Sequence, residues 1–317
     1  MPAVEAQGVG KRYGSLVALE ELTTSVEAGE VLGVLGPNGA GKTTAIRILT
    51  TLLQPDGGRF AVAGIPHTRG AEIRRRIGVL PEGAGYPHRQ TGEEYLRHHA
   101  RLFGHSRASA REVAGKLLDE VGLSDRGGTL IGSYSRGMRQ RLGIARALVN
   151  EPTVVFLDEP TLGLDPAGQQ QVLRHVRSIA SQREAAVLLS SHLLAEVEEN
   201  CSRVLILNRG RVVAEGTVSE IVQKAAAPRS ARLLVAPEHA SRAAAVLRTR
   251  AGVSEVGRAN GRPGLLTVSF AAPGLRSSNA CLEQALRALL DSGIELRSFE
   301  LEGARLSDAF LAMTEAA

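Results

Sequence analysis

Apolar residues in the first half of the chain fall into short runs that are separated by glycine-rich turns. The run at 31–35 predicts a buried strand, and the run after the next turn has helical spacing, with Ile46, Leu49, Leu52 and Leu53 on one face. Continuous apolar runs at 154–157, 185–190 and 204–207 predict three more buried strands. Strands of a parallel sheet that is covered on both faces have this appearance.

The remaining pattern divides the chain into two domains. Residues from about 83 to 151 are mostly helical in spacing, and the pattern breaks at 225–230. After the break the predicted order is strand, helix, strand, strand, helix, strand and a last helix, at 232–236, 239–250, 253–258, 265–270, 281–292, 294–301 and about 306–314, with a turn at 260–264. This βαββαβ order is ferredoxin-like. We therefore expect an α/β domain at 1–222 with a helical subdomain at about 84–150, a linker at 223–230, and a small α+β domain at 231–317.

Length and composition are those of a globular protein. A chain of 317 residues suggests two domains, and 43% hydrophobic with 22% charged residues is ordinary. No stretch approaches 18 consecutive apolar residues, so we expect no membrane span, and the first residues do not resemble a secretory signal. Cys201 and Cys281 form no metal motif, and we expect buried free thiols in a reducing cytosol.

The net charge of +5 raises the question of a nucleic-acid partner. The excess is spread along the chain, and the longest basic run, at 74–76, is explained as a solvated face. Aromatic residues are only 3%, which is poor for base stacking, so no nucleic acid is expected. The charge suits work near an anionic membrane surface. Only four of the 38 basic residues are lysines, which draws attention to Lys42.

A glycine-rich motif lies between the first predicted buried strand and the helix that follows it. It is a complete P-loop, in which backbone N–H groups and a helix N-terminus surround a phosphate chain. In this motif Lys42 reaches the β- and γ-phosphates, and the Thr43 hydroxyl holds Mg²⁺. A chance glycine-rich turn would not have both flanking elements. The predicted binding residues are Gly36, Pro37, Asn38, Gly39, Ala40, Gly41, Lys42, Thr43 and Thr44.

Two acidic residues follow the apolar run at 154–157. Asp158 would stand at the end of this strand, where it can hold Mg²⁺ through water, and Glu159 is placed to act as general base on the attacking water. Two solvated acids at a strand end are the plain alternative. The P-loop upstream favours the catalytic interpretation.

The segment 134–148 selects one family among P-loop ATPases. Ser135 and Gly137 precede a helix that ends in Ala145-Arg146-Ala147-Leu148, and here the chain resembles the ATP-binding subunits of ABC transporters. It departs from the family signature Leu-Ser-Gly-Gly-Gln at Tyr134, Arg136 and Met138, as in the branch of drug and polymer exporters whose permease is a separate chain. The resemblance implies a head-to-tail dimer in which the signature grips the γ-phosphate of ATP held by the opposite subunit.

Four more positions match the family in order. Tyr13 resembles the aromatic residue that stacks on adenine, and Asp165 ends a loop that resembles the one bridging the two sites of the dimer. His192 matches the switch histidine that contacts the γ-phosphate. Glu82 stands where the family usually has a glutamine, and its carboxylate can also ligate Mg²⁺.

The resemblance covers residues 1 to about 222 and implies an ATPase that drives a membrane permease. Its catalytic residues would be Lys42, Glu159 and His192, its ligands ATP and Mg²⁺, and its partners a permease and a second ATP-binding subunit, expected to be a copy of this chain. The place would be the cytoplasmic face of the membrane and the cargo a drug, antibiotic or other small molecule. The end of the chain resembles the accessory domain of antibiotic-exporter ATPases, or is a generic ferredoxin-like dimerisation domain. A soluble ATPase acting on nucleic acid or ribosomes, and a regulator that does not hydrolyse ATP, are the alternatives.

Overall fold

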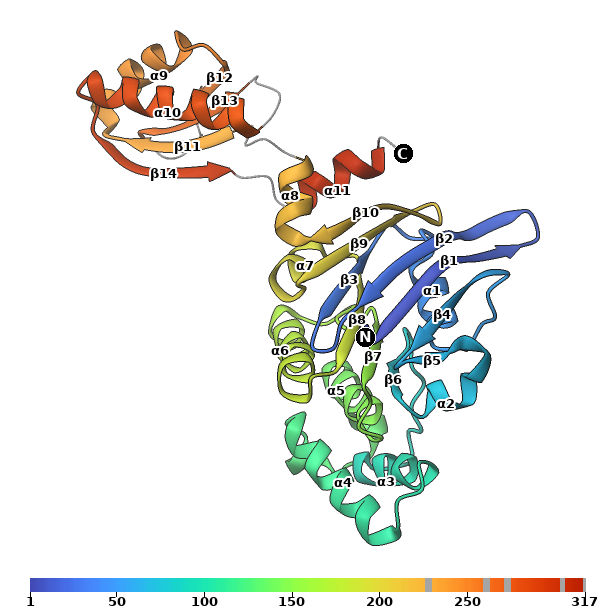
Figure 1. Ribbon diagram of the computed structural model, residues 1–317. Coiled ribbons are helices and arrows are strands. Elements are labelled where there is room, and N and C mark those ends of the chain that lie inside the picture. Colours follow the sequence, from blue (N-terminus) through green and yellow to red (C-terminus); the bar gives the residue numbers. More distant parts are fainter. Residues whose placement is uncertain (226–229, 259–262, 271–274, 303–305, 316–317) are drawn as a thin grey trace. The chain divides into compact units, whose positions relative to one another are not determined.

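The computed structural model describes residues 1–225, 230–258, 263–270, 275–302 and 306–315 (Figure 1). The chain forms two compact units, Met1–Thr217 and Val218–Ala317. The first is an α/β unit and the second is α+β, which confirms the fold class expected from the sequence. Most of the turn expected at 260–264 lies outside the described residues.

A six-stranded sheet forms the centre of the first unit. Its order is β10 (Arg211–Thr217), β9 (Arg203–Asn208), β3 (Val31–Leu35), β8 (Ala186–Ser191), β7 (Val154–Asp158) and β6 (Ile77–Leu80). All neighbours are parallel except β10 and β9. The four strands predicted from continuous apolar runs are all in this sheet. Because β8 lies between β3 and β7, the carboxyl ends of these three strands meet at one edge.

An antiparallel sheet is the second layer of this unit. Its order is β2 (Leu16–Val26), β1 (Val4–Tyr13), β4 (Gly57–Val62) and β5 (Ile65–Pro66). Its strands alternate between buried and more exposed residues, as expected for a sheet with one face on the core. The tip of the β1–β2 hairpin carries Tyr13 and Leu16, both of which are exposed.

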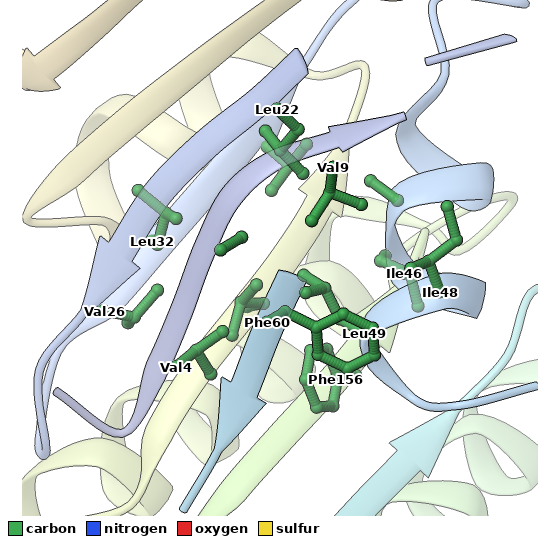
Figure 2. Packing of buried hydrophobic residues seen from close by; sticks show 14 of the residues in the cluster. Val4, Val9, Leu22, Val26, Leu32, Ile46, Ile48, Leu49, Phe60 and Phe156 are labelled. Carbon is green, nitrogen blue, oxygen red and sulfur yellow. The ribbon is translucent and has the colours of Figure 1, made fainter. Parts of the chain in front are cut away.

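Helix α1 (Lys42–Leu49) is held between the two sheets, and it carries the phosphate-loop motif at its start. Ile46, Ile48 and Leu49 of this helix belong to one buried cluster with Phe60 of β4 and Phe156 of β7 (Figure 2). Each of these side chains removes enough apolar surface from water to contribute about 1.5–3 kcal/mol. The loop before α1 is therefore fixed by the core of both sheets.

Seven helices complete the first unit within the described residues. They are α1 (Lys42–Leu49), α2 (Gly70–Arg74), α3 (Gly92–Leu102), α4 (Arg107–Glu120), α5 (Arg136–Ala147), α6 (Pro166–Arg183) and α7 (Leu194–Asn200), with 3₁₀ turns at His67–Arg69, Ser124–Arg126 and Ile131–Ser133. Helices α3 to α5 lie in the segment expected to be helical, and α3 and α4 stand at the end of the unit away from the β1–β2 hairpin (Figure 1). Helix α3 begins with a capping box between Thr91 and Glu94.

The predicted helical face after the phosphate loop is too long by one turn. Helix α1 ends at Leu49, and Thr51 turns the chain with a φ of +62°. Leu52 is therefore 68% exposed, although Leu53 still packs against the core.

The second unit has the predicted βαββαβ order. It contains β11 (Ser230–Val235), α9 (Ala240–Arg248), β12 (Val253–Arg258), β13 (Leu265–Phe270), α10 (Leu275–Asp291) and β14 (Leu296–Glu302), with α8 (Val218–Ala225), α11 (Leu306–Glu315) and a 3₁₀ turn at Pro237–His239. The sheet order β12-β13-β11-β14, antiparallel throughout, is that of a ferredoxin-like fold. Helices α8 and α11 pack against each other.

Two boundaries differ from the sequence expectation. Helix α8 runs to Ala225, so the first three residues of the expected linker at 223–230 are helical, and the unit boundary precedes this helix. Helix α10 begins at Leu275, six residues before the expected start. No helix among the described residues combines the length and the apolar character needed to span a bilayer.

Candidate active site

The loop between β3 and α1 contains two glycines, Gly36 and Gly41, at which any side chain would clash with neighbouring backbone. A Cβ added at Gly36 would lie 2.5 Å from the carbonyl oxygen of Leu207, and one added at Gly41 would lie 2.6 Å from that of Ala18. Gly41, the N-cap of α1, has a φ of +106°, which L side chains rarely adopt. The close approach of neighbouring backbone forces the loop to curl over the N-terminus of α1.

Lys42 is the first residue of α1, and its side chain is folded into this loop. It is only 6% exposed, and its Nζ donates to the carbonyl oxygens of Gly36 at 2.8 Å and Pro37 at 3.3 Å. The same Nζ lies 3.8 Å from Oε1 of Glu159. A buried ammonium with two carbonyl acceptors and a nearby carboxylate is well compensated for its loss of water.

The end of β7 presents two buried carboxylates. Asp158 is 3% and Glu159 is 9% exposed. Ser190, on the neighbouring strand β8, contacts both residues. Its Oγ donates to the side-chain Oδ1 of Asp158 at 2.5 Å and accepts from the backbone N–H of Glu159 at 3.1 Å. Glu159 has a φ of +51°, an unusual backbone conformation that strained functional sites often show.

His192 contacts the second oxygen of the Glu159 carboxylate. Its Nδ1 lies 2.6 Å from Oε2 of Glu159, and a carboxylate can only accept, so Nδ1 is the donor. The imidazole is 41% exposed, whereas the Glu159 side chain is 8% exposed. Lys42 and His192 therefore hold opposite oxygens of a single buried carboxylate.

Lys42, Glu159 and His192 line a cavity of about 600 Å³, a size suited to a small-molecule ligand. Its walls are Tyr13, Leu16, Val17, Ala18, Asn38, Gly39, Ala40, Gly41, Lys42, Thr43, Thr44, Glu82, Glu159, Leu162 and His192. The predicted adenine contact, most of the phosphate loop, Glu82 and both catalytic partners of Lys42 are thus brought together. Gly36 and Pro37 take part through their carbonyl groups on Lys42.

A second cavity, of about 330 Å³, adjoins the first and shares Glu82, Glu159 and Leu162 with it. Asp158 lines this second cavity rather than the first. Glu82 and Asp158 therefore approach the same region from the ends of β6 and β7. The donors available for Mg²⁺ are the Thr43 hydroxyl and these two carboxylates, and Mg²⁺ is commonly held by one or two carboxylates together with phosphate and water.

The signature residues lie outside the first cavity. Ser135 is the N-cap of α5, and its Oγ accepts from the backbone N–H of Met138 at 3.2 Å. Tyr134, which replaces the family leucine, is buried, and its hydroxyl donates to the carbonyl of Arg126 at 2.7 Å. Burial raises the pKa of Tyr134. Tyr134 is thus anchored in the core and fixed by a hydrogen bond just before the signature helix.

Gly137 and Asp165 are likewise separate from the first cavity. Gly137 lies in the first turn of α5, and Asp165 is the N-cap residue of α6, although its side chain makes no capping hydrogen bond. Arg136 lies against the loop before α6. A Cβ added at Gly163 in this loop would come within 2.6 Å of the Arg136 guanidinium. Within one chain, Ser135, Gly137 and Asp165 line neither the first cavity nor the second.

Sequence reasoning missed several residues of the site. Ser190 was treated only as part of a buried strand, although a polar residue at the end of an apolar run is a signal of a strand end at a site. The segment 16–18 was not predicted to line the cavity, since its position depends on the β1–β2 hairpin. Leu162 lines both cavities, although the sequence marks it only as the first residue of the loop that ends at Asp165 and resembles the bridging loop of the family.

Comparison with known proteins agrees with this geometry. A family model described as "ABC transporter" matches residues 19–162. The chain is 39% identical over 316 residues to the daunorubicin/doxorubicin resistance ATP-binding protein DrrA of Streptomyces peucetius, with 98% of this chain and 92% of that protein covered. Similarity over nearly the whole chain does not favour an ATPase of nucleic acid or ribosomes.

Solved structures give the same result. A structure of an ATP-binding subunit of an ABC transporter matches with a TM-score of 0.62 and 33% identity, covering 70% of this chain and 92% of that chain. A dimeric ATP-binding cassette bound to ADP and Pi matches with a TM-score of 0.62 and 24% identity, covering 68% and 98%, which shows the shared fold. The chain therefore belongs to the ATP-binding subunits of ABC transporters, a family whose ATP-binding domains hydrolyse ATP.

Proposed function

We propose that this chain hydrolyses MgATP in the larger cavity and thereby drives the export of a small molecule through a separate membrane permease. The observation that carries the proposal is the buried carboxylate of Glu159. It lies 3.8 Å from Lys42 Nζ and 2.6 Å from His192 Nδ1, at the wall of a cavity lined by the phosphate loop.

ATP is expected to bind with its phosphates over the loop and its adenine near Tyr13. The curled loop and the N-terminus of α1 offer backbone N–H groups to the phosphates. Lys42 would exchange the carbonyl oxygens that it now contacts for phosphate oxygens, which are charged and therefore stronger acceptors. Thr43, Asp158 and Glu82 are the residues that would hold Mg²⁺, which neutralises charge on the phosphates.

Glu159 is the proposed general base. Its carboxylate is buried at the cavity wall, so an attacking water can be oriented by one oxygen and lose a proton to it. His192 fixes the other oxygen and so limits rotation of the carboxylate. Positioning of this kind, together with Lys42 on the transferred phosphoryl group, is how phosphoryl transfer is generally catalysed.

A second copy of this chain is the proposed source of the missing contacts. Ser135, Gly137 and Asp165 lie outside the cavity of their own chain, at or near the N-termini of α5 and α6. A helix N-terminus is a favourable partner for a phosphate. In a head-to-tail dimer each copy would complete the site of the other.

Export of a drug-like or antibiotic-like molecule is the proposed physiological outcome. A relative that aligns with 98% of this chain is described by its resistance to daunorubicin and doxorubicin. The transport pathway is proposed to belong to a separate permease, as in the exporter branch that the signature segment resembles. We place the chain on the cytoplasmic face of the membrane, where ATP is available.

The enzymatic part is tested by phosphate release with MgATP. Glu159→Gln should lower turnover by at least about 10²–10⁴-fold, because the amide cannot accept the proton. Glu199→Gln, an exposed change on α7, is the matched control and should leave turnover unchanged. Full turnover in Glu159→Gln would exclude the assignment of the general base.

The transport part is tested with tagged Glu159→Gln protein. ATP is added to solubilised membranes of the source organism, and the proteins that co-purify are identified. A polytopic permease is expected, and its family would narrow the cargo. Recovery of ribosomal or DNA-bound proteins without any membrane protein would overturn the exporter function.

A further inference from the structure

Helix α7 carries a buried carboxylate that the proposed mechanism does not use. Glu196 is only 7% exposed, whereas its neighbours Glu198 and Glu199 on the same helix are exposed. It does not line either cavity. A buried carboxylate costs several kcal/mol unless hydrogen bonds compensate for the lost water, so its presence here requires a reason.

The contacts of Glu196 join the two segments that carry the proposed catalytic residues. Its Oε2 accepts from Thr161 Oγ1 at 2.7 Å and from Ser191 Oγ at 3.1 Å. Thr161 follows Glu159 by two residues, and Ser191 immediately precedes His192. One carboxylate oxygen therefore ties the loop after β7 to the end of β8.

A third hydrogen bond extends this arrangement past His192. The Ser191 hydroxyl accepts from the backbone N–H of Leu193 at 3.0 Å while it donates to Glu196. The backbone on both sides of His192 is thus held by one side chain. The 2.6 Å contact between His192 Nδ1 and Glu159 Oε2 requires the backbones of these two residues to keep their relative position. The hydrogen bonds of Glu196 to Thr161 and Ser191, called the brace below, therefore help to maintain this contact.

The charge state of Glu196 is consistent with a brace rather than with a proton acceptor. Burial is the main reason that its pKa is raised, and the negative charge of Glu159 acts in the same direction, against the two hydroxyl donors and His192. Its other oxygen, Oε1, is buried and has no hydrogen-bond partner in the described part of the chain. Oε2 accepts both hydroxyl hydrogens whether or not Oε1 carries a proton, so the brace does not depend on the charge.

We propose that Glu196 is a positioning residue, which holds the loop of Glu159 and the loop of His192 together through Thr161 and Ser191. The proposal rests on the proposed roles of Glu159 and His192. Loss of the brace lets the two loops separate and misplaces the general base, without removing any group that contacts ATP. Turnover should therefore fall while nucleotide binding is preserved.

The test compares turnover, nucleotide binding and stability in the full chain. We expect Glu196→Ala to lower kcat by between about tenfold and 100-fold, the size expected for a misplaced catalytic group. The Kd for a fluorescent ATP analogue should change less than about twofold, since the phosphate loop is untouched. Glu196→Gln keeps a carbonyl oxygen for the two hydroxyl groups and should restore most of the turnover, and Glu199→Ala should resemble the wild type.

A double-mutant cycle separates positioning from a general loss of structure. If Glu196 acts through the Glu159–His192 contact, Glu196→Ala should add little to the loss already caused by His192→Ala. Thermal unfolding of each variant shows that the fold is retained at the assay temperature. The positioning role of Glu196 would be contradicted by any of three results. They are full additivity of the losses in Glu196→Ala and His192→Ala, an unchanged kcat in Glu196→Ala, and no recovery of turnover in Glu196→Gln. Unimpaired turnover in Glu159→Gln would instead overturn the proposed function on which it rests.

Discussion

The hydroxyl group of Tyr86 lies directly against Gly143, in the middle of α5. A Cβ added at Gly143 would come closer to this oxygen than van der Waals contact permits, and would lie 2.6 Å from Cδ1 of Leu80. Tyr86 belongs to the loop after β6 that also carries Glu82. The glycine therefore allows this loop to pack on the signature helix, which explains a glycine in a helix interior.

Gly143→Ala is expected to destabilise the first unit by up to about 2 kcal/mol. Alanine favours a helix by about 1 kcal/mol relative to glycine, but overpacking costs about 1–3 kcal/mol, so the clash equals or exceeds the gain. Tyr86→Phe should recover part of this loss in the double variant, because it removes the clashing oxygen. Urea unfolding of the four proteins gives the comparison, and equal losses with and without Tyr86→Phe would contradict the contact.

Tyr86→Phe alone should not destabilise the protein. The Tyr86 hydroxyl is buried and has no hydrogen-bond partner in the described residues, and burial raises its pKa to about 12. Removing a buried polar group without a partner is neutral or stabilising. A clear loss of stability in this variant would indicate a partner that the described residues do not include.

Ser190→Ala should weaken the first unit and the site together. The change leaves Oδ1 of Asp158 without its donor and removes one of two acceptors of the Glu159 N–H, the other being the Ser190 carbonyl at 3.2 Å. We expect a loss of about 1–3 kcal/mol in the free energy of unfolding and lower turnover. Ser124→Ala removes an exposed hydrogen bond to Asp119 and is the control, with an effect under about 0.5 kcal/mol.

Glu82→Gln restores the residue usual in the family and should change the metal requirement. Glu82 lines both cavities, beside Glu159 and near Asp158. Loss of one negative charge should raise the Mg²⁺ concentration for half-maximal turnover by several-fold, up to about tenfold. Titration of turnover with Mg²⁺ and with Mn²⁺ measures the change, with exposed Glu112→Gln as control. Identical metal curves would show that Glu82 is no ligand.

The stability of the first unit should fall as the pH is lowered from about 6.5 to 4. Burial, and then the positive charges of Arg146 and His98, lower the pKa of His99 to about 4. Between these values the unfolded chain binds a proton that the folded chain does not, so the free energy of unfolding decreases with falling pH. His99 is only half-buried, and solvent screening reduces the size of the effect.

Urea unfolding at several pH values tests this dependence. His99→Asn should flatten the slope between pH 4 and 6.5, whereas His98→Asn, at an exposed position on α3, should leave most of it. The same slope in both variants would assign the dependence to other groups.

The parts of the site that the sequence predicts are those encoded in a few consecutive residues. The phosphate loop needs glycines and a lysine in fixed order, and the apolar run before Asp158 predicts that this residue ends a buried strand. The sequence predicts the second unit because the spacing of apolar residues differs between its strands and its helices. Its first helix, α8, shows the limit, since the sequence predicts its last three residues as linker, whereas the last helix, α11, lies where it is predicted.

The parts that the sequence does not predict depend on which strands become neighbours. Ser190 contacts Asp158 because β8 pairs with β7, and no property of either segment specifies this pairing. Glu196 meets Thr161 for the same reason, across 35 positions of the chain. Arg136 departs from the family signature, and its contact with Gly163, in a loop that follows much later, is likewise visible only in the structure.

The strand order of the central sheet has a consequence for synthesis on the ribosome. Among the described strands, β3, which delivers the phosphate loop, pairs only with β8 and β9, the latter ending at Asn208, about 170 residues later. At about 5–20 residues per second, translation of that interval takes roughly 10–35 s. For most of this time, until β8 has been made up to Ser191, the apolar residues of β3 have no neighbouring strand, so the nascent chain depends on chaperones or on the β1–β2 hairpin for cover. Nucleotide can stabilise the protein only after β9 has emerged, late in the synthesis of the first unit.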